Sequence, residues 1–247
     1  RKDYLIPSIV IKSISDVYNA HNYKQVVDIC DSVLNDSHNY YEDIRREISY
    51  WICLALCRMA KDNEGSSNRF WKEIKKIDGA DGKFLRGFYF RHLGDYSRAE
   101  SCFRETLDMS PNMQRAKREL VSVLLFQKKY DEALSLAKEN YEQDSDNTYH
   151  IHAYFRCLVK KHKMQRADIK KIENLMDAVQ KSYSEKKEEL YAAMNIEYCA
   201  YVKRDNVQKV LSMIREYERE FPSSMDVKRS ANDYKQKQHI PSDEDCA

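Results

Sequence analysis

The sequence predicts an all-α protein, a right-handed superhelical solenoid of about six helical hairpins with a C-terminal capping helix. Three observations support this prediction. Tyr96 and Ala99 recur 34 residues later as Tyr130 and Ala133, and alanine recurs again at Ala167. Glycine and proline are scarce, at 5 and 4 of 247 residues, although strands and tight turns need both. Apolar residues follow helical spacing, so repeated helices with short joints are expected.

The N-terminal third is expected to form two helical hairpins. The first hairpin covers residues 8–20 and 23–36, and the second covers 40–61 and 67–77. Residues 63–67, Asn-Glu-Gly-Ser-Ser, are the most loop-like stretch between these helices, because glycine and serine break helical patterns.

The middle of the chain shows the helical period most clearly. Ile151 is followed by Tyr154, Phe155 and Leu158, which places all four on one helical face. Pro111 stops one helix before the next begins. The expected helices cover 81–93, 97–109, 113–127, 131–143, 147–161 and 165–181.

The C-terminal part is expected to form one more hairpin, over 185–203 and 207–220, closed by Pro222. A last helix, 224–238, has few apolar positions and resembles a cap whose outer face meets water. Its apolar positions are Met225, Val227, Ala231 and Tyr234.

Repeat quality divides the chain into four segments. Degenerate hairpins occupy 1–79, clearer repeats occupy 80–181, and a final hairpin with its capping helix occupies 182–238. The tail 239–247 is acidic and lacks apolar anchors, so we expect it to be disordered.

Composition narrows the functional classes. The net charge of +2 provides no overall field toward nucleic acid or membrane. Seven cysteines without a disulfide-like framework indicate reduced core thiols in a cytoplasmic protein. No signal peptide or membrane-spanning run is visible. The first residue is Arg1 and not Met, so we expect a fragment of a longer polypeptide.

Residues 80–113 carry small, aromatic and turn residues at fixed offsets, namely Gly87, Phe90, Gly94, Tyr96, Ala99, Phe103 and Pro111. This pattern closely resembles that of the tetratricopeptide repeat (TPR) family. Small side chains at Gly87 and Ala99 let two helices approach, and the aromatic rings fill the space around the contact. The segment departs from the family pattern at Lys83, Arg86 and Thr106.

The neighbouring repeats are weaker. Residues 114–147 keep Leu120, Tyr130 and Ala133, with Val121 at the glycine position, and residues 148–181 keep only Ala167. A looser resemblance, from Phe70-Trp71 through 115–120 to Tyr149-His150-Ile151, is to the sensor repeat regions of large bacterial signal-transduction ATPases.

The sequence shows no catalytic or cofactor-binding pattern. It lacks a phosphate-binding loop, a dinucleotide-binding turn and a His-Glu-x-x-His motif. Cys53 and Cys57 have no second ligand pair, and His150 and His152 point apart on a helix. We therefore predict no enzyme, no cofactor and no metal site.

The TPR resemblance implies that the first helix of each hairpin lines a concave groove. At the family's groove offsets, the chain has Phe84, Phe88, Arg91, Arg115, Arg118, Ser122, Leu125, Tyr149, His152 and Arg156, with Asp81 as the only acid, at the edge. Arginine binds carboxylates through two parallel hydrogen bonds, so these residues indicate a groove for an acidic protein or peptide. The same residues also fit ordinary exposed helix positions with no partner.

The predicted function is therefore a protein–protein interaction scaffold or sensor module that binds an acidic segment. A structural alternative is an array that self-associates or packs on a missing effector domain of a longer chain. A third hypothesis is an RNA-binding helical repeat. It is less favoured, because no basic run in the sequence is longer than three residues. No membrane partner is expected.

Overall fold

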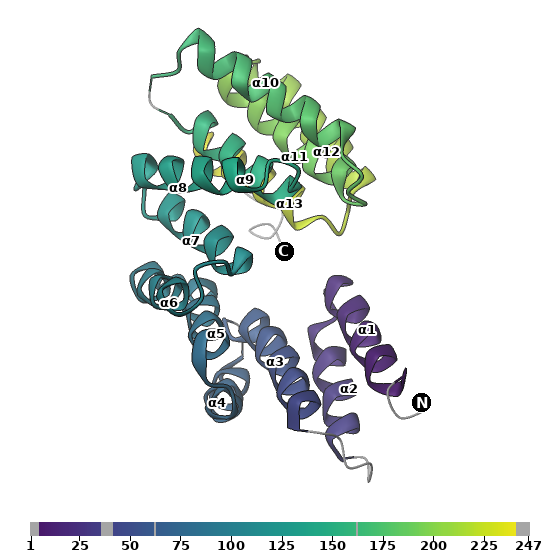
Figure 1. Ribbon diagram of the computed structural model, residues 1–247. Helices are drawn as coiled ribbons and strands as arrows, with labels where there is room; N and C mark the ends of the chain where they lie inside the picture. Colours follow the sequence, from purple (N-terminus) through teal and green to yellow (C-terminus); the bar gives the residue numbers. More distant parts are fainter. Residues whose placement is uncertain (1–4, 36–41, 62, 162, 241–247) are drawn as a thin grey trace. The chain divides into compact units, whose positions relative to one another are not determined.

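The computed structural model describes residues 5–35, 42–61, 63–161 and 163–240 (Figure 1). All regular secondary structure in this part of the chain is helical, and each of the thirteen predicted helices is present. The elements are α1 (Leu5–Asn19), α2 (Tyr23–Asn35), α3 (Glu42–Met59), α4 (Glu64–Glu73), the 3-10 helix η1 (Ile74–Lys76), α5 (Gly79–His92), α6 (Tyr96–Met109), α7 (Gln114–Phe126), α8 (Tyr130–Gln143), α9 (Thr148–Val159), α10 (Arg166–Lys181), α11 (Lys187–Glu197), the π-helical turn η2 (Tyr198–Val202), α12 (Val207–Glu220) and α13 (Met225–Lys237).

The chain forms two compact units, Arg1–Gln127 and Lys128–Ala247, which are called unit 1 and unit 2 below. Helices α1 to α7 belong to unit 1, and α8 to α13 belong to unit 2. The boundary falls inside the predicted fourth hairpin, in the turn between its two helices. The division by repeat quality stays a prediction, and most of the predicted disordered tail, 241–247, lies outside the described residues.

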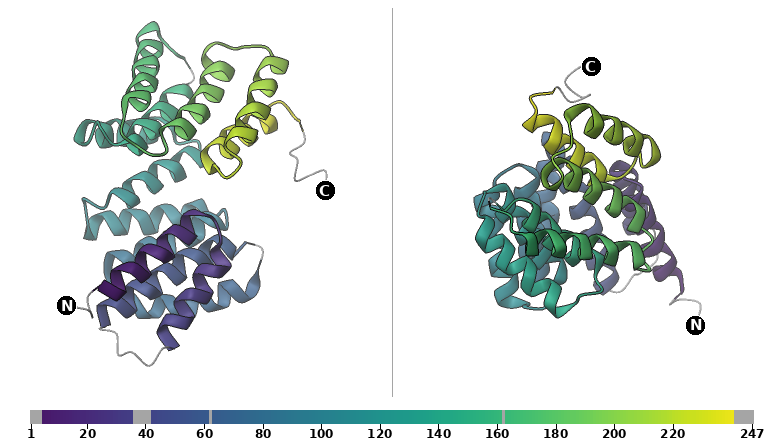
Figure 2. Two further views of the ribbon diagram at one scale, coloured as in Figure 1. Left: turned by 90° about the vertical axis from the view of Figure 1, so that its right-hand side faces the viewer. Right: turned by 90° about the horizontal axis from the view of Figure 1, so that it is seen from above.

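Unit 1 is a stack of helical hairpins (Figure 2). Helices α1, α3, α5 and α7 contact one another in that order, and α2, α4 and α6 pack beside them. The hairpin of α5 and α6 shows why small residues recur. A Cβ atom on Gly87 would lie 2.8 Å from a ring carbon of the fully buried Phe103, so only glycine permits this approach. Ala99 is also fully buried, as the repeat pattern predicts.

Four of the hairpin turns use a left-handed residue. Gly94 has φ of 79° between α5 and α6, and Asp95 then caps α6 by accepting a hydrogen bond from the backbone N–H of Arg98 at 3.0 Å. The corresponding residues of other hairpins are His21, Lys128 and Arg204, with φ of 62°, 61° and 54°. Glycine is therefore used at only one of these described turns.

The predicted loop at 63–67 was wrong. Helix α4 begins at Glu64, because the Asn63 side chain accepts a hydrogen bond from the backbone N–H of Ser66 at 3.2 Å. The asparagine caps the helix, and Glu64 in the first turn favours its positive end. Gly65 and Ser66 thus lie inside the helix, and capping outweighs their low helix propensity.

In unit 2, the last helix, α13, packs on α11, α12 and α9. Its apolar side rests on an apolar cluster of α11 and α12, including Ile196 and Ile214. Val227, Ala231 and Tyr234 are buried as predicted, but Met225 is 50% exposed. Ser230 is also buried, so the cap is partly polar inside.

The predicted repeat position Ala167 also differs from expectation. Ala167 is exposed on α10, whereas Ile172 is fully buried. The longer turn between α9 and α10 shifts the helical phase, so a strict 34-residue spacing no longer selects the buried side. Ala133 keeps the phase and is fully buried.

The described cysteines are free thiols, and five of them are buried: Cys30, Cys53, Cys57, Cys157 and Cys199. Cys102 is partly exposed. Within the described ranges, no three His, Cys, Asp or Glu side chains are grouped as metal ligands would be. No helix in this part of the chain is both long and apolar enough to cross a bilayer.

Candidate functional site

The predicted groove residues are divided between the two units. Phe84, Phe88, Arg91, Arg115, Arg118, Ser122 and Leu125 lie on α5 and α7 of unit 1, and Tyr149, His152 and Arg156 lie on α9 of unit 2.

One end of the unit 1 site is a pocket of about 390 Å³ at the start of α5 and α7. Arg115 Nη1 donates a hydrogen bond of 2.7 Å to the Tyr50 hydroxyl on α3. The same guanidinium lies 5.1 Å from the Tyr50 ring centre and 5.6 Å from that of Phe84. The pocket is lined by Asp43, Arg46, Glu47, Tyr50, Trp51, Ile77, Asp81 and Arg115. Its wall therefore combines aromatic surface with charges of both signs.

Further along the same helices, two arginines pair with one carboxylate, and a third acts on it electrostatically. Arg91 Nη1 lies 3.2 Å from Glu119 Oε2, and Arg118 Nε lies 3.7 Å from Glu119 Oε1. The positive charge of Arg58, on α3, also lowers the pKa of the Glu119 carboxyl. We call Arg58, Arg91, Arg118 and Glu119 the arginine cluster. It brings three positive groups from three neighbouring first helices to one negative group.

The pKa values of Glu119 and of the neighbouring His92 show that positive charge dominates the arginine cluster. Burial acts to raise the pKa of the Glu119 carboxyl, but the surrounding cations hold that pKa below its ordinary value. Next to it, burial and then Arg91 and Arg58 lower the pKa of His92 to about 3. His92 is therefore neutral at physiological pH. Glu119 is thus a negative charge at pH 7 that pairs with Arg91 and Arg118.

The predicted aromatic residues form the floor of this site. Phe84 and Phe88 are only 2% and 5% exposed, with ring centres 5.9 Å apart. Arg58 lies over the Phe88 ring at 5.1 Å and donates a hydrogen bond from Nε to the Tyr18 hydroxyl at 3.2 Å. The rings thus support the arginines from below and offer little surface of their own to a ligand. Leu125 is also buried, and Ser122 is partly exposed.

Sequence reasoning missed three members of this site: Tyr50, Arg58 and Glu119. Tyr50 and Arg58 lie on α3, where the degenerate repeat offers no register for assigning groove positions. The expectation that Asp81 is the only acid was wrong, because Glu119 reaches Arg91. Glu119 directly follows Arg118 in the sequence, so a search for acidic residues next to the predicted groove arginines would have found it.

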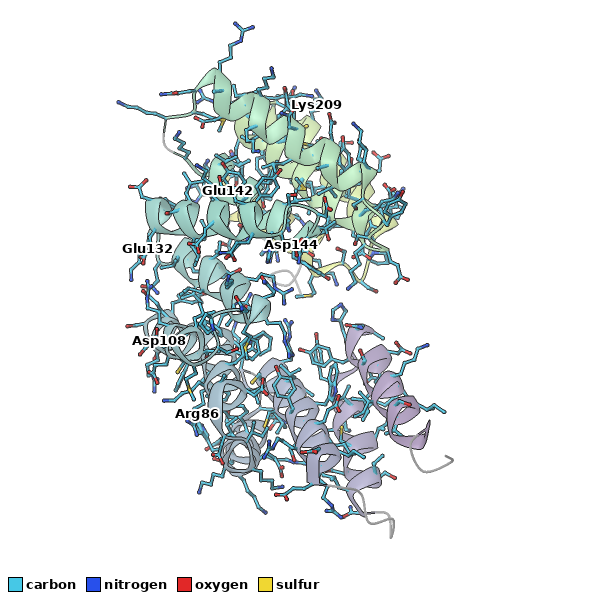
Figure 3. The ribbon with its side chains drawn as sticks, viewed as in Figure 1. Arg86, Asp108, Glu132, Glu142, Asp144 and Lys209 are labelled. Atoms are coloured by element: carbon cyan, nitrogen blue, oxygen red, sulfur yellow. The ribbon has the colours of Figure 1, made fainter. Side chains whose placement is uncertain are left out.

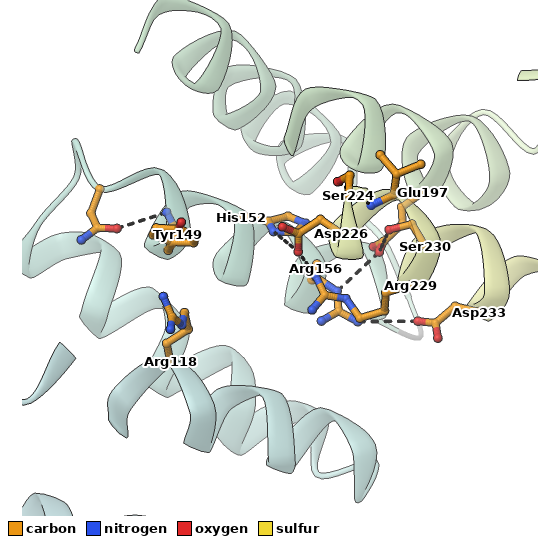
Figure 4. A network of polar contacts seen from close by, with 12 residues as sticks. Arg118, Tyr149, His152, Arg156, Glu197, Ser224, Asp226, Arg229, Ser230 and Asp233 are labelled. Atoms are coloured by element: carbon orange, nitrogen blue, oxygen red, sulfur yellow. Dashed lines mark hydrogen bonds and ion pairs between the residues drawn. The ribbon is translucent and has the colours of Figure 1, made fainter. Parts of the chain in front are cut away.

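In unit 2, α9 contributes to a buried polar network (Figure 4). Arg156 is 5% exposed, and its Nε and Nη2 atoms lie 3.4 Å from Glu197 Oε1 and 3.6 Å from Asp233 Oδ2. Ser230 donates a hydrogen bond of 2.8 Å to the same Glu197 oxygen. Lys160 Nζ also lies 3.4 Å from Asp233 Oδ2. We call Arg156, Glu197, Ser230 and Asp233, with His152 and Asp226, the unit 2 network.

His152 completes this network beneath α13. Its Nδ1 atom lies 3.9 Å from Asp226 Oδ1, and burial lowers the pKa of the imidazole to about 4. Arg156 was expected to be an exposed groove residue, but its ion pairs lie inside unit 2. Tyr149 is 39% exposed and remains a candidate surface residue.

No protein-family model matches this sequence. No curated protein matches it significantly either. A solved structure from Pseudomonas aeruginosa, reported in a functional characterisation of the TPR-containing protein PilF, is similar, with a TM-score of 0.52 and 13% sequence identity. The similarity covers 94% of this chain and 100% of that one. At this identity the likeness concerns the fold, and it confirms the predicted TPR-like helical-repeat architecture. The resemblance to sensor regions of signal-transduction ATPases stays a prediction.

Proposed function

We propose that this chain is a protein-interaction module whose unit 1 binds an acidic protein segment across α3, α5 and α7. The helical-repeat fold supports the general role, because stacked hairpins present extended surfaces to other proteins. One observation supports the finer role: in the arginine cluster, two guanidinium groups pair with one buried carboxylate, and a third acts on it electrostatically. The excess positive charge favours a ligand that supplies further carboxylates.

The depth of the arginines suggests how such a segment binds. Arg118 and Arg91 retain 34% and 17% side-chain exposure, so one carboxylate of the segment would meet Arg118 first. A carboxylate can bind a guanidinium through two parallel hydrogen bonds, and that geometry needs a fixed guanidinium plane. Ion pairing and the aromatic floor fix the planes here. A second side chain of the segment would enter the pocket beside Arg115.

The test uses a fluorescein-labelled polyglutamate peptide and measures fluorescence anisotropy. Replacing Arg115 and Arg118 together by Gln should weaken binding at least tenfold, since each charge-assisted contact is worth about 1.5–3 kcal/mol. The matched control replaces Arg98 and Arg104 by Gln. Both lie on α6 with 64% and 44% side-chain exposure, and the control loses the same charge. It should bind nearly as well as the wild type.

Two outcomes would contradict the proposal. Equal loss of affinity in both double variants would show attraction by net charge alone. Retained binding by the Arg115→Gln/Arg118→Gln protein would remove this face from recognition. Sedimentation of both variants tests the structural alternative, because a self-association surface on α7 would change the oligomeric state of the first variant only.

A further inference from the structure

Basic residues gather at one edge of unit 2. Three connections in unit 2 each contain two adjacent cations: Lys128-Lys129 before α8, Lys160-Lys161 after α9, and Lys203-Arg204 after η2. Lys163 and Arg166 add exposed charge to the second turn. The hairpin turns of unit 1 have no such pair within the described residues; two of them read His21-Asn22 and Gly94-Asp95.

The three turns share an edge because consecutive helices of unit 2 run in opposite directions. Near the end of α8, Tyr141 contacts Tyr154 in the middle of α9, and Lys171 of α10 lies over both rings. From this contact α8 runs back toward its start while the antiparallel α9 runs on to its end, so both reach the same edge. The Tyr198 hydroxyl, at the start of η2, donates a hydrogen bond of 2.5 Å to Glu173 in the second turn of α10. The start of α8, the end of α9, the start of α10 and the end of η2 therefore lie together. We call this the basic edge.

The opposite edge has a different composition. The turn between α8 and α9 contains Asp144 and Asp146, and Figure 3 places Glu132 and Asp144 toward opposite ends of α8. The turn between α10 and α11 and the helix ends beside it carry Lys181, Lys186 and Lys187, but Glu185 and Glu188 lie among them. The positive charge is thus concentrated on one edge, although the whole chain carries only +2.

Some charges of the basic edge are neutralised within the fold. Lys161 pairs with Asp168 at 2.9 Å, and Lys160 pairs with Asp233 at 3.4 Å. The acids Asp131 and Glu132 also lie at the start of α8. Lys163, Arg166 and Arg204 are exposed. The edge keeps a positive excess after these pairs are subtracted.

The shape and chemistry of the basic edge restrict its partner. Cations on successive turns of stacked hairpins form a row, which suits a linear polyanion better than a compact anion. Membrane-surface elements combine cations with inserted apolar side chains. Among the described residues of these turns, the only large apolar one is Met164, and it is partly buried.

Two of the cations occupy positions that glycine would fill more easily. Lys128 and Arg204 have φ of 61° and 54°, where a side chain is strained. Gly94 occupies the same position in unit 1. The basic side chains are thus placed at the tips of the turns despite a conformational cost.

From this geometry we propose that the basic edge of unit 2 binds the phosphate backbone of a nucleic acid without reading its bases. Each lysine or arginine would neutralise a phosphate and release its counterions, so binding would weaken steeply with salt. The site is separate from the acidic-segment site proposed in unit 1. Either proposal can therefore fail alone.

The experiment titrates the whole chain into fluorescein-labelled single-stranded RNA and measures anisotropy at several salt concentrations. The variant Lys128→Glu/Lys163→Glu/Arg204→Glu changes one cation on each turn. Its affinity should fall at least tenfold, and the slope of log affinity against log salt should become shallower by about 2, since each lost single-strand contact removes about 0.7.

The matched control is Lys181→Glu/Lys186→Glu/Lys187→Glu, which makes the same change of charge on the opposite edge. It should keep near-wild-type affinity. Circular dichroism checks that both variants fold, and Gln replaces Glu at the same positions if one does not. Equal losses in both variants would overturn the proposal, as would wild-type protein that binds phosphatidylserine vesicles but not RNA.

Discussion

Two helix contacts, one in each unit, are built in opposite ways. In unit 1, α5 meets α6 through Gly87, Ala99 and Phe103, and this buried part of the contact is apolar, whereas the ion pair of Lys83 with Glu105 lies at its partly exposed margin. In unit 2, α9 meets α11 and α13 partly through Arg156, Glu197 and other charged groups. The first contact depends on size at fixed local spacing. The second depends on complementary charges from three helices that are far apart in sequence.

The difference has an energetic consequence. An apolar contact loses stability in proportion to the volume that is added or removed. A buried ion pair gains little over apolar residues, but losing one partner leaves a charge without compensation. Unit 2 should therefore be sensitive to single charge changes, whereas the apolar contact of unit 1 should be sensitive to size.

The largest expected effect is at Glu197, which is 1% exposed. Glu197→Ala should destabilise unit 2 by about 3–5 kcal/mol, because it leaves the Arg156 guanidinium buried beside a cavity. Urea unfolding followed by circular dichroism measures this loss. The double variant Arg156→Met/Glu197→Leu should recover most of it, because both charges are removed together. A double variant as unstable as Glu197→Ala would show that the ion pair itself stabilises unit 2.

The second effect is a dependence of unit 2 stability on pH. His152 has a pKa of about 4 when folded, below its ordinary value near 6.5, so the unfolded chain binds more protons between these values. Its contribution is fully present above pH 6.5 and is lost as the pH falls to 4. The loss should reach about 3 kcal/mol. The facing groups Asp226, Glu197, Arg156 and Arg229 modulate it.

His152→Gln should flatten the stability profile of unit 2 in this pH window, as measured by thermal melting at closely spaced pH values. His92→Gln is the matched control in unit 1, because His92 is also buried with a lowered pKa, of about 3. It should flatten the unit 1 transition and leave unit 2 unchanged. A profile for His152→Gln identical to that of the wild type would remove this histidine as the cause.

The two contacts also differ in how far the sequence could predict them. The hairpin of α5 and α6 was predicted with its small residues and aromatic rings, because a hairpin is a local structure and its spacing is fixed. The unit 2 network was missed because its members come from α9, α11 and α13. No sequence offset connects Arg156 with Glu197 or Asp233.

The candidate site in unit 1 was predicted in part for the same reason. Arg91, Arg115 and Arg118 follow family offsets in the clearer repeats. Arg58 lies on α3, where the repeat is degenerate, so the offsets could not select it. At Ala167 the family offset did select a residue, but the wrong one. The 34-residue spacing is kept in the sequence, yet the longer turn before α10 changes which side of that helix is buried.

A smaller effect is expected at the apolar contact. Ala99→Leu should overpack the crossing of α5 and α6 and destabilise unit 1 by about 1–3 kcal/mol, since Ala99 is fully buried. Ala167→Leu is the control, because Ala167 is exposed on α10 and should change stability by less than about 0.5 kcal/mol. Equal melting temperatures for the two variants would show that Ala99 does not limit the helix approach.

The smallest effect compares the hairpin turns of the two units. Gly94 and Arg204 both have positive φ, but only glycine adopts this conformation without strain. Gly94→Ala should therefore destabilise unit 1 by about 1 kcal/mol, and Arg204→Gly should stabilise unit 2 by a similar amount. If the basic edge binds nucleic acid, Arg204→Gly should also weaken RNA binding while raising the melting temperature. Opposite changes in stability and affinity would show that Arg204 serves binding at the expense of the fold. A variant that gains stability and keeps full affinity would leave the turn without a role in binding.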